Sequence, residues 1–171
     1  MTDEAPVVFV LDANVFMEAH RRYYALDLCP GFWECLAHYC HEPRLLSIDR
    51  VRDEIGDDDA LSDWVKDAPD ELFVSSAEQP VVDTFSEMMT WVQGNTQFRP
   101  EAKAEFAAVA DGWLAAYAKV HGAVLVTQEV YSADVKRKVP LPNVCRQFRV
   151  ATRDTFSMLR ELEVRFGWIR V

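Results

Sequence analysis

The chain has little positive charge, few cysteines and no long apolar run. Its formal net charge of −10 at pH 7 argues against a protein that holds nucleic acid mainly through an overall positive field, although a local basic patch is compatible with this charge. The acidic start, Thr2-Asp3-Glu4, precedes an apolar run that is too short for a signal peptide or a membrane span. We therefore expect a cytoplasmic protein without a membrane segment.

The four cysteines lack the paired C-x-x-C spacing of zinc sites and the density of a disulfide scaffold. Reduced, mostly buried thiols are the expectation. An alternative is a zinc site drawn from Cys35, His38, Cys40 and His41, although two of these side chains would simply face the core if the segment is a helix.

Nothing in the sequence divides the chain. There is no internal repeat, no low-complexity tract and no linker rich in Pro, Gly or Ser. Since half of the 171 residues are apolar, the chain is able to bury a sizeable core, and we expect one domain over residues 1–171.

Short apolar runs alternate with segments of helical periodicity. The runs predict buried strands over Val7–Leu11, Leu45–Ile48, Leu72–Val74 and Ala123–Val126. Apolar residues at helical spacing lie between them, for example Phe85, Met88, Met89 and Val92. This alternation predicts an α/β fold in which a central, mainly parallel sheet carries helices on both faces.

Helix boundaries are marked in several places. Pro80 and Pro100 suit first turns, and Gly94-Asn95 suits the end of the helix that contains Phe85. Residues 101–120 form either one long helix or two helices, with Asp111 at the start of the second. A further amphipathic helix is predicted over residues 154–166.

Acidic residues recur where predicted strands end or helices begin. They are Asp12, Glu54, Asp111 and Glu129. Because the carboxyl ends of parallel strands lie on one edge of a sheet, these side chains are expected to converge. Converging carboxylates repel one another unless they are protonated or bridged by cations, and oxygen ligands suit Mg²⁺ or Mn²⁺.

Metal-assisted hydrolysis of a phosphodiester is the natural chemistry of such a cluster. One ion would lower the pKa of a bound water, and a second, about 4 Å away, would stabilise the leaving oxygen. Each acid also has a structural interpretation. Asp12 is placed to cap a helix, and Glu54 to pair with Arg50 or Arg52 on a solvated helix face.

These motifs together resemble the PIN-domain nucleases, and within them a bacterial group related to the VapC toxins. The motifs are Leu11-Asp12-Ala13-Asn14, Asp53-Glu54-Ile55, Asp111-Gly112-Trp113-Leu114 and Thr127-Gln128-Glu129. The resemblance to the bacterial group adds Arg22-Tyr23-Tyr24, Cys29-Pro30-Gly31-Phe32-Trp33 and Leu141-Pro142-Asn143-Val144-Cys145, and so covers nearly the whole chain.

The resemblance implies a three-layer α/β/α fold and an acidic cluster that binds Mg²⁺ or Mn²⁺ and cuts RNA. Asp12, Glu54 and Asp111 match the most typical acids, and Asn14 matches the polar residue after the first. The fourth position departs from the common Thr-x-Asp, since Glu129 follows Thr127 here and Asp134 is a rival for its role. Thr127 is expected either to orient a ligand carboxylate or metal-bound water, or to be an ordinary residue at a strand end.

Basic residues near the fourth motif offer a contact for RNA. Lys136-Arg137-Lys138 would hold phosphate near the metals, or form a solvated loop. Arg22, with Tyr23 and Tyr24, would clamp a strand by stacking, or pack beneath the following loop. The other prominent aromatic side chains are expected in the core or an interface, namely Phe32, Trp33, Trp91 and Trp113.

The leading hypothesis is therefore a Mg²⁺- or Mn²⁺-dependent endoribonuclease, the toxin of a VapBC-like toxin-antitoxin pair. The resemblance also implies an inhibitory antitoxin as partner and a homodimer. Two alternatives are a PIN-like module that binds RNA or protein without cutting, and a metal-dependent DNA nuclease.

Overall fold

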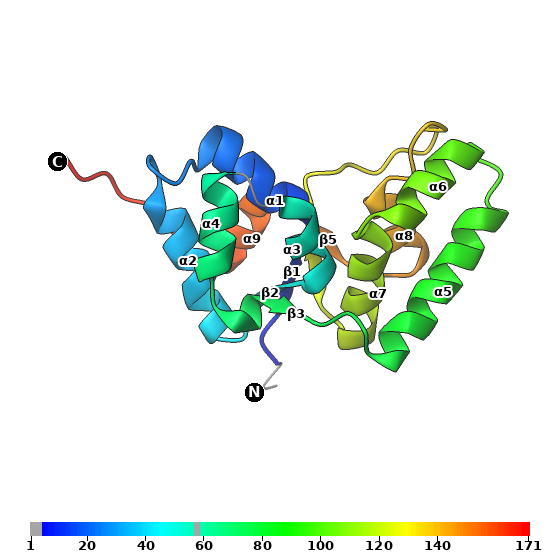
Figure 1. Cartoon of the computed structure of the whole chain (residues 1–171), viewed down its shortest axis with the longest axis horizontal. Helices are drawn as coiled ribbons and strands as arrows, with labels where there is room; N and C mark the ends of the chain where they lie inside the picture. Colours follow the sequence, from blue (N-terminus) through cyan, green and yellow to red (C-terminus); the bar gives the residue numbers. More distant parts are fainter. Residues whose placement is uncertain (1–4, 57–58) are drawn as a thin grey trace.

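A parallel sheet forms the centre of the fold. The computed structural model describes residues 5–56 and 59–171 of the chain (Figure 1). Within these residues the five strands pair in parallel, in the order β3 (Phe73–Val74), β2 (Leu45–Ile48), β1 (Phe9–Leu11), β4 (Val124–Val126) and β5 (Thr152–Arg153). The predicted α/β class with a parallel sheet is confirmed.

The central strand β1 is completely buried. Its register aligns Phe9 with Leu45 of β2 on one side and with Val124 of β4 on the other. Strands covered on both faces are apolar throughout, which is why their runs are visible in the sequence. The predicted bounds of β2 are confirmed. Strand β1 is shorter than predicted, since Val7 lies outside it and is 43% exposed. The third run is shorter too, because Leu72 ends the 3-10 helix η2 (Asp70–Leu72).

The edge strand β5 was not predicted from the sequence. It has two residues, both polar, and pairs with β4 through Leu125↔Thr152 and Val126↔Arg153. An apolar run marks a strand only where both faces are buried, and Arg153 is exposed. Strand β5 nevertheless places β4 inside the sheet, next to β1.

Helices cover both faces of the sheet. In chain order these elements are α1 (Ala13–Glu18), the π-helix η1 (Ala19–Tyr23), α2 (Pro30–His41), α3 (Asp49–Ile55), α4 (Ala60–Asp67), α5 (Gln79–Gly94), α6 (Pro100–Ala108), α7 (Asp111–His121), α8 (Leu141–Gln147) and α9 (Thr155–Glu161). In Figure 1, α2, α4 and α9 lie on one side of the sheet, and α5, α7 and α8 lie on the other. The molecule is therefore a three-layer α/β/α structure.

The segment with two alternatives forms two helices. Helix α6 ends at Ala108 and α7 begins at Asp111, so that Asp111 lies at a helix start. The predicted boundaries at Pro80, Pro100 and Gly94 are confirmed, because both prolines occupy first turns and α5 ends at Gly94.

The predicted helix over residues 154–166 is too long. Helix α9 is capped by the Asp154 side chain, which accepts the Ser157 N–H, and it ends at Glu161. Glu163 has a φ of 58°, and the Val164 N–H closes the end by donating to the Leu159 carbonyl. Met158 and Leu159 form the buried face, while Phe156 and Phe166 stay partly exposed at about 40%. The prediction was too long because the helical spacing of apolar residues continues to Phe166, beyond the end of α9 at Glu161.

The cysteines are free thiols, and Cys40 and Cys145 are buried. Burial raises the pKa of the Cys35 and Cys40 thiols to about 11, which keeps them protonated and poor metal ligands. Across residues 5–56 and 59–171, no three His, Cys, Asp or Glu side chains are spaced to hold a metal ion, so the zinc alternative finds no support. In the same part of the chain, no helix combines the length and apolar character needed to cross a membrane.

Candidate active site

The predicted acids line one cavity of about 270 Å³ at the carboxyl edge of the sheet. Its polar lining consists of Asp12, Asn14, Glu54, Glu105, Asp111, Glu129 and Lys138. Asp12 directly follows β1, Glu54 lies in the last turn of α3, Asp111 begins α7, and Glu129 lies three positions beyond β4. The expected convergence is therefore present, and it brings together side chains from four separate segments.

Asp12 is almost completely buried, with 2% of its surface exposed. It precedes α1 in the N-cap position, but its side chain makes no capping bond. Instead, the Thr127 hydroxyl donates to Oδ2 of Asp12 at 2.9 Å. The two residues are neighbours because the Asp12 N–H donates to the carbonyl of Val126, which continues the pairing of β1 with β4. Thr127 thus orients a carboxylate, one of the two roles considered for it.

Glu54 links α3 to the junction of α6 and α7. Its Oε1 accepts the Ala110 N–H at 2.6 Å, directly before Asp111. The surface pairs considered for Glu54 involve other groups, since Arg50 donates to Ser76 and lies over the Trp113 ring, and Arg52 lies 3.8 Å from Asp53. Glu54 therefore positions the start of α7 while it also lines the cavity.

The cavity holds more negative charge than its surroundings neutralise. Burial, together with the negative charges of Asp12, Glu129 and Glu54, raises the pKa of Asp111 to about 8, although Lys138 lowers it. The pKa of Asp12 is raised to about 6, mainly by burial and also by the charges of Glu129 and Glu54, while the Thr127 hydrogen bond lowers it. Raised carboxyl pKa values of this kind are typical of functional sites and are relieved by a cation.

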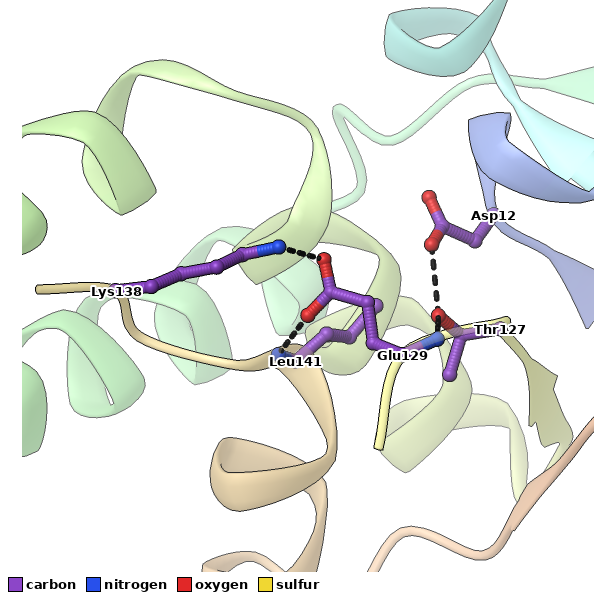
Figure 2. A network of polar contacts seen from close by, with 5 residues as sticks. All are labelled: Asp12, Thr127, Glu129, Lys138 and Leu141. Carbon is purple, nitrogen blue, oxygen red and sulfur yellow. Dashed lines mark hydrogen bonds and ion pairs between the residues drawn. The ribbon is translucent and has the colours of Figure 1, made fainter. Parts of the chain in front are cut away.

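Glu129 is held by contacts at both carboxylate oxygens. Its Oε1 lies 2.5 Å from Nζ of Lys138, and its Oε2 accepts the Leu141 N–H at 2.9 Å. The Glu129 N–H donates to the Thr127 hydroxyl at 3.1 Å. Figure 2 shows this network from Asp12 through Thr127 and Glu129 to Lys138.

Several predicted residues lie outside the cavity. Asp134, the rival of Glu129, is exposed and does not line it. Lys136 and Arg137 are exposed on the same loop and do not line it either, in contrast to Lys138. Arg22 is also outside and forms an ion pair of 3.0 Å with Glu18, one turn earlier.

The two tyrosines have different environments. Tyr24 stacks on Phe32 at 4.6 Å between ring centroids, and its carbonyl accepts the Trp33 indole N–H. It therefore packs against the segment that follows it, which was one of the two alternatives. Tyr23 is 63% exposed and meets Phe156 edge to face. Phe32 and Trp33 belong to the core as predicted, whereas Trp91 and Trp113 are half-buried and pack against it.

Glu105 was not identified from the sequence. It lies on α6, is exposed, and contributes a further carboxylate to the rim of the cavity. A glutamate on an exposed helix face is normally a surface residue, so no local signal distinguished it. Its place in the cavity depends on how α6 packs beside α7.

The donor set fits an ion held by few protein ligands. As noted above, no three acidic, His or Cys side chains of the described chain are gathered as a ready-made ligand group. Asp12 and Asp111 are the best pair, because a buried and a half-buried carboxylate line one cavity and the charge of Asp12 acts on Asp111. Mg²⁺ commonly takes one or two carboxylates and keeps several waters, so this pair suits it better than a cage made only of protein ligands.

Comparison with known protein families identifies the family of this chain. The family described as "Domain of unknown function (DUF4411)" matches residues 9–166. That range contains every polar residue that lines the cavity, from Asp12 to Lys138. A search of curated proteins found no match. Since the match covers most of its length, the chain belongs to the DUF4411 family.

Proposed function

We propose that the protein is a Mg²⁺- or Mn²⁺-dependent endoribonuclease that hydrolyses RNA phosphodiester bonds in the acidic cavity. The observation that carries this proposal is the pair Asp12 and Asp111, a buried and a half-buried carboxylate in one cavity whose pKa values are raised to about 6 and about 8. Keeping both groups ionised side by side is costly unless a cation binds there, and this cost supports a divalent ion as the ligand of the cavity.

Four residues that line the cavity, and Thr127 beside them, have a role in the proposal. Asp12 and Asp111 would hold the ion, and Thr127 keeps the Asp12 carboxylate in position through its hydroxyl. Glu54 holds the start of α7, and therefore Asp111, through the Ala110 N–H. Asn14 lines the same cavity from α1 and offers an amide for substrate or water. When bound, the ion lowers the pKa of a water so that it becomes the nucleophile at neutral pH.

RNA as the substrate, and a role as the toxin of a VapBC-like pair with an antitoxin partner, rest on the resemblance of the motifs to PIN-domain nucleases. The same cavity chemistry would serve a metal-dependent DNA nuclease. The requirement for a 2′-hydroxyl separates the two, because this group distinguishes RNA from DNA at a binding site.

The test is cleavage of a mixed set of labelled RNAs and of DNAs of the same sequences, with Mn²⁺ or with chelator. Asp111→Asn removes the charge of one proposed ligand. Asp67→Asn, an exposed aspartate at the end of α4, is the matched control. We expect Mn²⁺-dependent cleavage of RNA by the wild type and by Asp67→Asn, and a loss of about 100-fold or more in Asp111→Asn, the scale of removing a group that stabilises the transition state.

Other outcomes select the alternatives. Cleavage of both nucleic acids, or of DNA alone, would support the DNA nuclease. RNA binding without cleavage by any of the folded proteins would support the non-catalytic module. For the toxin role, expression in bacterial cells should arrest growth with the wild type and leave growth unaffected with Asp111→Asn.

A further inference from the structure

Lys138 contributes a positively charged side chain to the lining of the acidic cavity, and Glu129 holds this side chain in place. The Nζ of Lys138 lies 2.5 Å from Oε1 of Glu129, while Oε2 of the same carboxylate accepts the Leu141 N–H (Figure 2). With both oxygens engaged, Glu129 has less capacity to bind an ion than Asp12 or Asp111. Its contacts are those of a residue that positions a lysine.

The backbone on both sides of this ion pair is well anchored. Val139 and Leu141, on either side of Pro140, are buried, and α8 begins at Leu141. On the other side, the Glu129 N–H donates to the Thr127 hydroxyl, which in turn donates to Asp12. Further along the same loop, Ser132 is held by Asn143 of α8, whose amide accepts the Ser132 N–H and donates to the Ser132 carbonyl. The ion pair is therefore fixed relative to the proposed ion ligands, although its loop contains no helix or strand.

The two partners differ in their access to solvent. The Lys138 side chain is 54% exposed, whereas that of Glu129 is 11% exposed. A substrate entering the cavity can therefore meet the ammonium, while the carboxylate is largely covered. Lysine binds phosphate as a compact point charge, and its spare N–H donors remain available beside a carboxylate.

We propose that Glu129 and Lys138 form a phosphate subsite, in which Glu129 positions the Lys138 ammonium against a non-bridging oxygen of the scissile phosphodiester. This inference rests on the proposed function and assigns Glu129 to the substrate rather than to the ion. The charge of the cavity supports it. The carboxylates that line the cavity carry more negative charge than one divalent ion neutralises. An RNA phosphate would therefore be repelled from the cavity unless a fixed cation lay beside the phosphate.

The experiment measures binding without cleavage. A fluorescein-labelled single-stranded oligoribonucleotide is titrated with protein in chelator over a series of salt concentrations, and Mn²⁺ binding is measured separately by calorimetry. The variants are Glu129→Gln and Lys138→Met. The control Glu87→Gln removes the same charge from an exposed position of α5, away from the cavity. Melting temperatures show whether each variant is folded.

Removing the charge of Glu129 separates the two interpretations by the sign of its effect. If Glu129 only repels phosphate, Glu129→Gln should tighten RNA binding. In the proposed subsite it should weaken binding by about 3-fold or more, since an ammonium that is no longer held loses most of a phosphate contact. Glu87→Gln should leave binding unchanged or tighten it slightly.

Lys138→Met should lower the slope of log K against log salt by about 0.7, the value for one phosphate contact with a single strand. Mn²⁺ should bind both variants with the same stoichiometry as the wild type. Tighter RNA binding by Glu129→Gln, an unchanged salt slope in Lys138→Met, or loss of Mn²⁺ binding in Glu129→Gln would each overturn the proposal. If Glu129→Gln does not fold, the slope of Lys138→Met decides.

These measurements can refute the phosphate subsite without refuting the proposed nuclease, and the reverse is also true. A wild type that never cleaves RNA, but whose RNA binding is weakened by Glu129→Gln, would keep the phosphate subsite and refute the nuclease. A wild type that cleaves RNA, but whose Glu129→Gln variant binds RNA more tightly, would keep the nuclease and refute the subsite.

Discussion

The hydroxyl of Thr127 donates a hydrogen bond of 2.9 Å to the buried carboxylate of Asp12 and so joins the ends of β4 and β1. This bond lowers the pKa of Asp12 against the larger effect of burial. The same hydroxyl accepts the Glu129 N–H, so one side chain positions both a proposed ion ligand and the proposed phosphate subsite. Thr127 is therefore the central polar contact of the site.

Replacing Thr127 by Val keeps the shape of the side chain and removes the hydroxyl. We expect a loss of about 1–3 kcal/mol in the free energy of unfolding, because the Asp12 carboxylate is left buried with one hydrogen bond fewer. The loss should be larger at pH 8 than at pH 5, since Asp12 is ionised above a pKa of about 6. Urea unfolding at both pH values measures it. Thr127→Ser keeps the hydroxyl and should stay closer to the wild type at pH 8, and equal losses in the two variants would contradict the role of the hydrogen bond.

The stability of the metal-free protein should fall as the pH rises from about 4 to about 8. Asp111 and Asp12 have folded-state pKa values of about 8 and about 6, above their ordinary value of 3.8. The folded state therefore binds more protons than the unfolded state in this range. For this reason the free energy of unfolding decreases as the pH rises. Melting temperatures in chelator between pH 5 and pH 8.5 test this. Asp111→Asn should flatten the decline, whereas Asp67→Asn should follow the wild type, and a melting temperature that rises over this range would contradict the raised pKa values.

Adding Mn²⁺ should stabilise the protein, and removing it should reverse the effect. An ion that binds the folded state alone contributes about 2.7 kcal/mol at a concentration of 100 times its Kd, which corresponds to about 5–10 °C in melting temperature for a chain of this size. The shift should increase between pH 6 and pH 8, because ligand carboxylates must be deprotonated. In Asp12→Asn the shift should disappear. A melting curve that does not respond to Mn²⁺ in the wild type would argue against the ion site.

Gly112, directly after Asp111, allows α5 and α6 to pack closely against the start of α7. A Cβ at this position would lie 2.9 Å from Cε2 of Phe85 and 3.0 Å from Cε of Met89. Phe85 has little freedom to move, because it stacks on Trp113 with 3.8 Å between centroids. Overpacking should cost about 1–3 kcal/mol, against a gain of up to about 1 kcal/mol in helix propensity.

We therefore expect Gly112→Ala to destabilise the protein by about 1 kcal/mol and to weaken Mn²⁺ binding by displacing Asp111. The matched control is Gly94→Ala at the end of α5, where a Cβ would meet no atom within 4 Å. That substitution should be neutral or stabilising. Chemical denaturation of both variants provides the comparison, and a Gly112→Ala protein more stable than the wild type would refute the packing argument.

Features with a local cause were predictable from the sequence. The buried strands β1, β2 and β4 are apolar runs, and the helix starts at Pro80 and Pro100 follow from the fixed φ of proline. The convergence of Asp12, Glu54, Asp111 and Glu129 followed from one rule, that parallel strands end at the same edge of a sheet. The sequence left open whether Asp111 begins a helix or lies within one, because the apolar spacing continues through the break between α6 and α7.

Features that depend on distant contacts were not predictable. Strand β5 is polar and exists because it pairs with β4. Glu105 reaches the cavity only through the packing of α6. Lys138 lines the cavity, whereas its neighbours Lys136 and Arg137 do not. These residues lie in a loop without periodicity, and the ion pair with Glu129 distinguishes Lys138 from the other two. In each case the deciding partner lies elsewhere in the chain.

The place of β4 between β1 and β5 also bears on how the protein is made. The contact of Thr127 with Asp12 spans 115 positions, so β1 leaves the ribosome long before its neighbour on that side has been translated. Until then β1 has an open edge, which is a site for wrong pairing, and the carboxylates have no common cavity. In a nascent chain, Asp12 is therefore synthesised well before Asp111 and Glu129, with which it later lines the cavity.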